Sequence, residues 1–130
     1  MASSTVYHDA FNNKLIELLN DMITTFPNIC DDLKTLKHGI SMIKNISPKI
    51  PQTFFQEHVS APYEDKILAE DEEFFLAHDY TDDVKLIHGF NINFIGKVKS
   101  MWKDMNEDNK RSIWKYMLVL MALSRKCMNV

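Results

Sequence analysis

Apolar residues recur every three or four positions in the first part of the chain, which is the spacing of one face of an α-helix. Over residues 5–25 this stripe contains Phe11, Leu15, Leu18, Leu19, Met22 and Ile23. Over residues 28–45 a second stripe contains Ile29, Leu33, Leu36, Ile40 and Ile43. The heptad-like spacing ends after little more than two heptads at Ser47-Pro48, so it predicts a hairpin of packed helices over 5–47 rather than a coiled coil.

The ends of the second helix carry their own signals. Pro27 separates it from the first helix, and Asn28 is the expected N-cap. Asp31 and Asp32 follow in the first turn, where negative charge is favourable.

The middle of the chain, residues 51–83, is divided by prolines. Pro51 and Pro62 are each followed by a helical pattern with adjacent aromatic residues nearby. This predicts two or three short helices with a break at Ala61-Pro62. Residues 78–91 contain turn residues without a sustained period, which predicts the longest loop.

The C-terminal part, residues 91–127, predicts a second helical hairpin. One helix is expected over 92–105, and Asn106 is the expected N-cap of a last helix that reaches Lys126. The apolar run at residues 116–123 is too short for a transmembrane helix, which needs about 20 residues. Because the run covers most of the helix circumference, we expect a central helix with Trp114, Met117, Leu118 and Met121 inside.

A run apolar on more than one side also predicts a partner surface that neighbouring helices leave uncovered. Flexible methionine side chains adapt to different packing arrangements, which favours this use. The candidate protein interface consists of Trp102, Met117, Met121 and Met128.

Composition favours an all-α, single-domain irregular helical bundle of five to seven helices over residues 1–130. Three glycines and four prolines leave few turn residues, and a 45% hydrophobic content is enough for one core. Cys30 and Cys127 are single and distant, so neither a disulfide framework nor a ligand-spaced pair is expected. With no secretory signal at the N-terminus, we expect an intracellular, reducing location.

Charge is distributed unevenly around a net value of −3. Residues 64–83 contain nine acidic residues and one lysine, whereas residues 84–130 contain nine basic and three acidic residues. We expect the two regions to pair, within the domain or between copies. The candidate acidic surface is Glu70, Asp71, Glu72 and Glu73, and the candidate basic surface is Lys97, Lys103, Lys110, Arg111 and Lys115.

The basic C-terminal third, with Trp102, Trp114 and Tyr116 as stacking faces, suggests nucleic-acid binding as an alternative function. The negative net charge disfavours it, and the helical spacing assigns both tryptophans to the core.

No motif predicts catalysis or cofactor binding. No two of the five histidines have the spacing of metal ligands on one helix face, and the acidic "EDEEFF" lacks the pattern of a calcium loop. Cys30 has no identifiable histidine partner, and there is no glycine-rich phosphate loop. We therefore predict no catalytic, cofactor-binding or metal-binding residues, and a non-enzymatic protein.

Two stretches resemble a known group of proteins. They are "FFQEHVSAPYEDKILAEDEEFF" at residues 54–75 and "MWKDMNEDNKRSIWKYMLVLMAL" at residues 101–123. Their order of Pro-Tyr, Ile-Leu, acidic and Phe-Phe words, followed by paired Trp-Lys words, resembles small uncharacterised helical proteins of nucleocytoplasmic large DNA viruses. The resemblance spans roughly the last two-thirds of the chain, and it implies no activity or catalytic residues.

If the resemblance holds, it implies a viral protein in the host cytoplasm or in the virion. Together with the expected interface, it predicts a protein-interaction module that acts in virion structure, assembly or host-factor engagement. The expected partner is another protein or a second copy of the chain.

Overall fold

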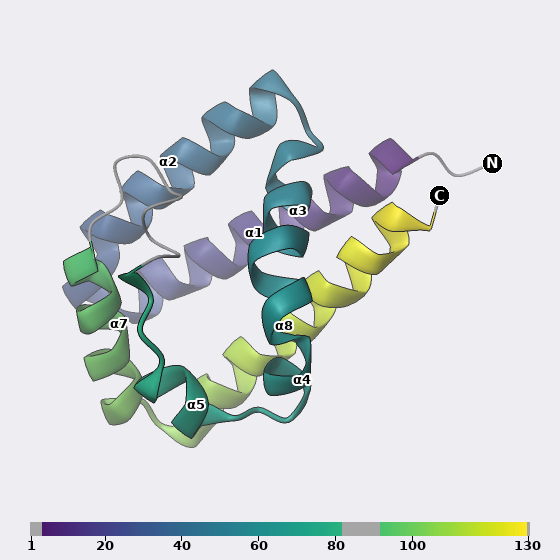
Figure 1. The fold of residues 1–130 in the computed structure, drawn as a ribbon. Helices are drawn as coiled ribbons and strands as arrows, with labels where there is room; N and C mark the ends of the chain where they lie inside the picture. Colours follow the sequence, from purple (N-terminus) through teal and green to yellow (C-terminus); the bar gives the residue numbers. More distant parts are fainter. Residues whose placement is uncertain (1–3, 82–91, 130) are drawn as a thin grey trace.

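The computed structural model describes residues 4–81 and 92–129, and within these ranges it contains helices and no strand (Figure 1). The all-α fold expected from the sequence is confirmed. The long helices are α1 (Ser4–Thr25), α2 (Cys30–Ile46), α7 (Ile92–Asp104) and α8 (Glu107–Met128). The shorter elements are η1 (Pro27–Ile29), α3 (Ile50–Phe55), η2 (Gln56–Ser60), α4 (Ala61–Leu68) and α5 (Glu72–Ala77).

The predicted loop at 78–91 is only partly visible. Residues 78–80 are non-helical, and residues 82–91 lie outside the described residues.

The N-terminal hairpin joins α1 to α2 through the 3₁₀ turn η1, and α1 also packs along α8. The expected N-cap at Asn28 is wrong, because Asn28 lies inside η1 and Ile29 takes the cap position without a side-chain hydrogen bond. Pro27, whose fixed φ suits the first position of a helical turn, starts the turn earlier than the pattern predicted. By contrast, Asn106 caps α8 as expected, with its side chain accepting from the Asn109 N–H at 2.8 Å.

The predicted break at Ala61-Pro62 is also wrong, because helical structure continues from α3 through η2 into α4. η2 is a π-helical turn in which the Ala61 N–H bonds to the Gln56 carbonyl, five residues earlier. A proline ring in a regular α-helix clashes with the carbonyl four residues before it. We attribute the continuity to the wider π turn, which gives Pro62 room at the start of α4.

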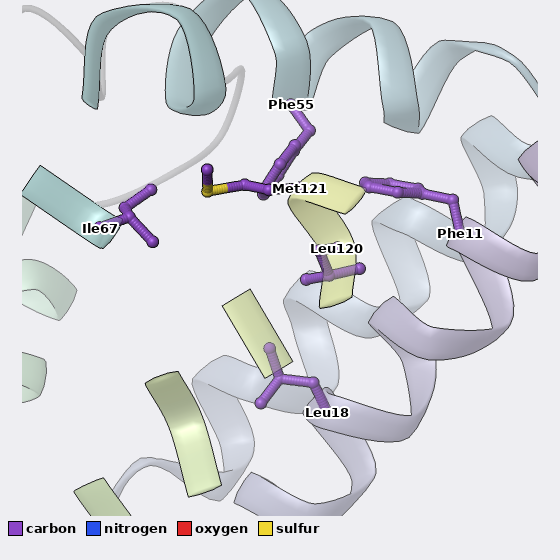
Figure 2. Packing of buried hydrophobic residues seen from close by; sticks show 6 residues of the cluster. All are labelled: Phe11, Leu18, Phe55, Ile67, Leu120 and Met121. Atoms are coloured by element: carbon purple, nitrogen blue, oxygen red, sulfur yellow. The ribbon is translucent and has the colours of Figure 1, made fainter. Parts of the chain in front are cut away.

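Two hydrophobic clusters form the core. The first joins α1, α3, α4 and α8 and contains Phe11, Leu18, Phe55, Ile67, Leu120 and Met121 (Figure 2). Its Phe11 and Phe55 rings meet edge to face with centroids 5.3 Å apart, a favourable aromatic geometry. The second joins α1, η1, α2 and α7 and contains Leu19, Ile29, Leu33 and Phe94.

A chain of buried polar side chains crosses the first cluster. The Nε2 of His8 donates to the Oε1 of Gln52 at 3.1 Å, and the Nε2 of Gln52 donates to the Oγ of Ser124 at 2.8 Å. The Oγ of Ser124 in turn donates to the Oε1 of Gln56 at 3.0 Å. Because a buried polar group costs free energy unless it is hydrogen-bonded, this chain favours a single register of α1, α3 and α8.

Candidate protein-binding groove

An apolar groove lies between the short helices α4 and α5 and the long helices α7 and α8. Its volume is about 270 Å³. Helices α4, α5, α7 and α8 contribute most of its walls, which include Ile67, Phe75, Leu76, Ile95, Val98, Trp102, Ile113, Trp114 and Met117. Among the described residues that line it, only Glu72 and Lys99 carry a charge.

Both tryptophans of the chain line this groove. The turn between α7 and α8 brings them together, and their rings meet edge to face with centroids 5.4 Å apart. The Phe75 ring of α5 also lies near Trp114, with ring centroids 6.0 Å apart. The tryptophans are half-buried, so each keeps part of its surface available at the groove.

Lys110 holds α5 against α8 beside the tryptophans. Its side chain is 10% exposed, and its Nζ lies 3.0 Å from the Oε1 of Glu72. The same Nζ lies 5.6 Å from the centroid of the Trp102 ring. The expectation that Lys110 belongs to a solvated basic surface is therefore wrong, because packing of α5 on α8 covers the lysine and supplies its carboxylate.

The segment that follows α5 is held at one side of the groove. The Nζ of Lys99 donates to the His78 carbonyl at 2.6 Å and lies 5.1 Å from the centroid of the Tyr80 ring. The hydroxyl and backbone N–H of Thr81 both donate to the Asp79 carboxylate. These bonds, helped by the positive charge of Lys99, lower the pKa of Asp79.

The four predicted interface residues do not form one surface. Trp102 and Met117 line the groove. Met121 is only 4% exposed and belongs to the first core cluster, so it does not contribute to the surface of this chain. Met128 is 56% exposed near the end of α8, eleven residues beyond Met117, which corresponds to about 16 Å along a helix.

The central position expected for α8 is observed in part. Met121 is buried, whereas Trp114, Met117 and Leu118 are half-buried. Trp114 is less covered than the sequence pattern predicts because it forms a wall of the groove.

The acidic residues have separate roles. Asp71 is the N-cap of α5, where its side chain accepts from the Phe74 N–H at 3.1 Å, and Glu72 pairs with Lys110. Glu70 and Glu73 are exposed. Pairing of the acidic segment with the C-terminal third is confirmed by Glu72–Lys110 and by a second ion pair between Glu64 and Arg125.

The basic residues are also divided. Lys97 contacts Asp32 of α2 at 3.3 Å, and Arg111 contacts Asp108 one helical turn earlier at 3.1 Å. Lys103 and Lys115 are exposed on α7 and α8.

The described residues do not meet the structural requirements of a three-ligand metal site or of a membrane-spanning helix, and both cysteines are free. Residues 4–81 and 92–129 contain no group of three or more His, Cys, Asp or Glu side chains arranged to hold a metal ion. In the same ranges, no helix combines the length and apolar character needed to cross a membrane. Both cysteines are free thiols, and burial raises the pKa of Cys127.

Comparison of the chain with protein-family models, curated protein sequences and solved structures finds no match.

Proposed function

We propose that the chain is a non-enzymatic protein-interaction module whose groove binds the apolar face of a partner helix. The observation that carries this proposal is the groove itself, which presents Trp102, Trp114 and Met117 together in one apolar hollow. Tryptophan and methionine are enriched at protein interfaces, and binding energy concentrates where an aromatic residue lies in a well-packed pocket.

The size and charge of the groove support a protein partner over a cofactor. A volume of about 270 Å³ lies just below the range of roughly 300–1,000 Å³ that is typical of small-molecule sites. Glu72 pairs with Lys110 and Lys99 donates to the His78 carbonyl, so both charged residues in the described lining of the groove already have a partner. Large aliphatic or aromatic side chains spaced along one face of a helix suit these walls.

Exposed charges on the helices that form the groove are the basis for the charge pattern that we propose for the partner. Glu73 is exposed on α5, whereas Lys103 and Lys115 are exposed on α7 and α8. A partner helix with basic residues on the flank near α5 and acidic residues on the opposite flank complements this arrangement. Such complementarity would set the orientation of the bound helix more than its affinity.

The resemblance described above adds a viral setting to the proposal, in which the partner is a virion protein or a host factor. Nucleic-acid binding by the C-terminal third has less support, because Lys110 is buried and Lys97 and Arg111 are already paired with carboxylates.

A site-specific crosslink tests where the partner binds. A photoreactive phenylalanine analogue in place of Leu76, which lines the groove, should capture a protein of defined mass in cells. The same analogue in place of Val119, which is 40% exposed on α8 outside the groove, is the matched control. The captured protein is then purified and titrated against the whole chain.

Tryptophan fluorescence provides the quantitative measurement, because both tryptophans line the groove. Partner binding should shift their emission to shorter wavelengths as water leaves the groove. Ile95→Ser should weaken binding at least about tenfold, since it removes a large apolar contact. Val119→Ser should not change the affinity. If the partner binds without an emission change, or binds the Ile95→Ser variant equally well, the groove is not its site.

A further inference from the structure

The corner between α2 and α3 exposes a compact set of large apolar side chains. Ile46 is 79% exposed, Met42 is 55% exposed, and Ile43 and Ile50 are 41% and 42% exposed. They lie within nine consecutive residues, 42–50, and make up half of the eight large hydrophobic residues exposed in the described ranges. We call these four residues the apolar corner.

The apolar corner arises because α2 extends past the core. Within the described residues, Ile40 is the last apolar residue of α2 that packs against a core cluster. The sequence pattern placed Ile43 on the buried stripe, and that placement is wrong. The end of α2 and the start of α3 form a projecting corner at the top of Figure 1.

The corner is held in place by the rest of the fold. The Pro48 carbonyl accepts from the Asn12 side chain of α1 at 2.9 Å, and the Ile50 N–H bonds to the Ser47 carbonyl at 3.3 Å. Its apolar side chains are therefore displayed from a preformed turn, so a ligand need not order this backbone when it binds.

Positive charge surrounds the apolar corner in the sequence. Residues 33–56 contain four lysines, Lys34, Lys37, Lys44 and Lys49, and no acidic residue. In α1, the stretch nearest to Pro48, residues 5–13, adds Asp9 alone. Lys44 and Lys49 lie within the corner itself, whereas Lys37 and Lys34 lie roughly 14 and 18 Å back along α2 from Ile46. Since charges act together over about 10 Å at moderate ionic strength, the corner attracts anionic surfaces mainly through Lys44 and Lys49.

We propose that the apolar corner docks on the surface of a lipid bilayer that carries anionic headgroups. Protein interfaces are enriched in aromatic residues, methionine and arginine and depleted in lysine, whereas residues 42–50 contain neither aromatic residues nor arginine but include one methionine and two lysines. At a bilayer, isoleucine and methionine enter the boundary of the acyl chains while lysine stems extend their ammonium groups to the headgroups.

This site is separate from the groove. The α2–α3 corner lies at one end of the molecule, and α5 lies at the opposite end (Figure 1). A bilayer at the corner therefore leaves the groove open to its partner, and the chain would bring a protein to a membrane surface.

Vesicle flotation of the whole chain tests the proposal. The chain should float with phosphatidylcholine vesicles that contain phosphatidylserine, and added salt should weaken this binding. Ile46→Asp should weaken it about tenfold or more, because an apolar contact is replaced by a charge that the headgroups repel. Leu68→Asp is the matched control, because Leu68 is likewise an exposed apolar residue, at 57%, but lies outside the corner. This variant should float like the parent.

A second variant tests the charge. Lys44→Gln combined with Lys49→Gln should weaken binding to the anionic vesicles roughly 30-fold, at about 1 kcal/mol per lysine, and leave any binding to pure phosphatidylcholine unchanged. Because Ile46 is highly exposed, Ile46→Asp should melt like the parent, and circular dichroism checks this.

Three results would overturn the proposal. The first is that the parent does not float with anionic vesicles. The second is that Ile46→Asp floats as well as the parent. The third is that Leu68→Asp weakens vesicle binding as much as Ile46→Asp does. A dimer that Ile46→Asp dissociates, without vesicle binding, would assign the corner to a second copy instead. Ile95→Ser should bind vesicles normally, so failure of the groove proposal and failure of the membrane proposal are distinguishable.

Discussion

Removing either partner of the Glu72–Lys110 ion pair should have unequal effects on stability. The Lys110 side chain is 10% exposed, and after Glu72→Gln the nearest carboxylate among the described ion pairs is Glu107, 3.8 Å from the Lys110 Nζ on a side chain that is 81% exposed. Breaking a fully buried pair costs roughly 3–5 kcal/mol, whereas an exposed pair contributes at most about 1 kcal/mol. The Glu72 side chain is 38% exposed, so we expect an intermediate loss of about 2 kcal/mol.

Lys110→Met should cost less. Methionine retains an apolar stem beside Trp102 and brings no charge, and Glu72 can turn its carboxylate further into water. We expect a loss below about 1 kcal/mol. In the double variant no Lys110 ammonium remains to be left without its carboxylate, so Glu72→Gln no longer carries that cost. The coupling free energy between the two sites should therefore be roughly 1–2 kcal/mol.

Urea unfolding followed by tryptophan fluorescence and by far-ultraviolet circular dichroism measures these values. The midpoints of the parent, the two single variants and the double variant form a complete cycle. The reasoning is refuted if Lys110→Met is the more harmful single change, or if the coupling is below about 0.5 kcal/mol.

Three further outcomes are expected. Glu70 has a positive φ of 50° just after α4, a conformation that glycine adopts without strain, so Glu70→Gly should raise the free energy of unfolding by about 1 kcal/mol; an unchanged urea midpoint would contradict this. Leu120→Ala removes a side chain that is 1% exposed and should cost roughly 2–5 kcal/mol, and a loss below 1 kcal/mol would mean that the core closes around the gap. Burial raises the pKa of Cys127, so at pH 8 few molecules carry its thiolate and a thiol reagent should label Cys30 alone until urea unfolds the chain. Rapid labelling of both thiols in the folded protein would show that Cys127 is accessible.

Helix positions followed from the sequence because their signals are local. Apolar spacing and the Asn106 cap located α1, α7 and α8 within about two residues, since each signal acts over one or two helical turns. The same spacing predicted Trp102 and Met117 as candidate interface residues, although it did not reveal the groove that both residues line.

Local signals failed where a residue's environment came from a distant segment. Lys110 looks like a surface lysine in its own helix, and only the packing of α5, 38 residues earlier in the chain, buries and pairs it. Pro62 signals a break, yet the π turn before it lets the helix continue. Nothing in the spacing of His8, Gln52 and Ser124 predicted that they would be hydrogen-bonded, because the bonds that join these three residues span 44 and 72 positions in the sequence.

The apolar corner shows the same division. The sequence by itself predicted a helix over residues 28–45, close to the observed Cys30–Ile46, and showed that its second half carries apolar and basic side chains but no acidic ones. Only the tertiary structure decided that this helix extends beyond the core after Ile40 and leaves Ile46 exposed. The physical reason is that helical periodicity depends on neighbours within four residues, whereas burial depends on where the other helices end.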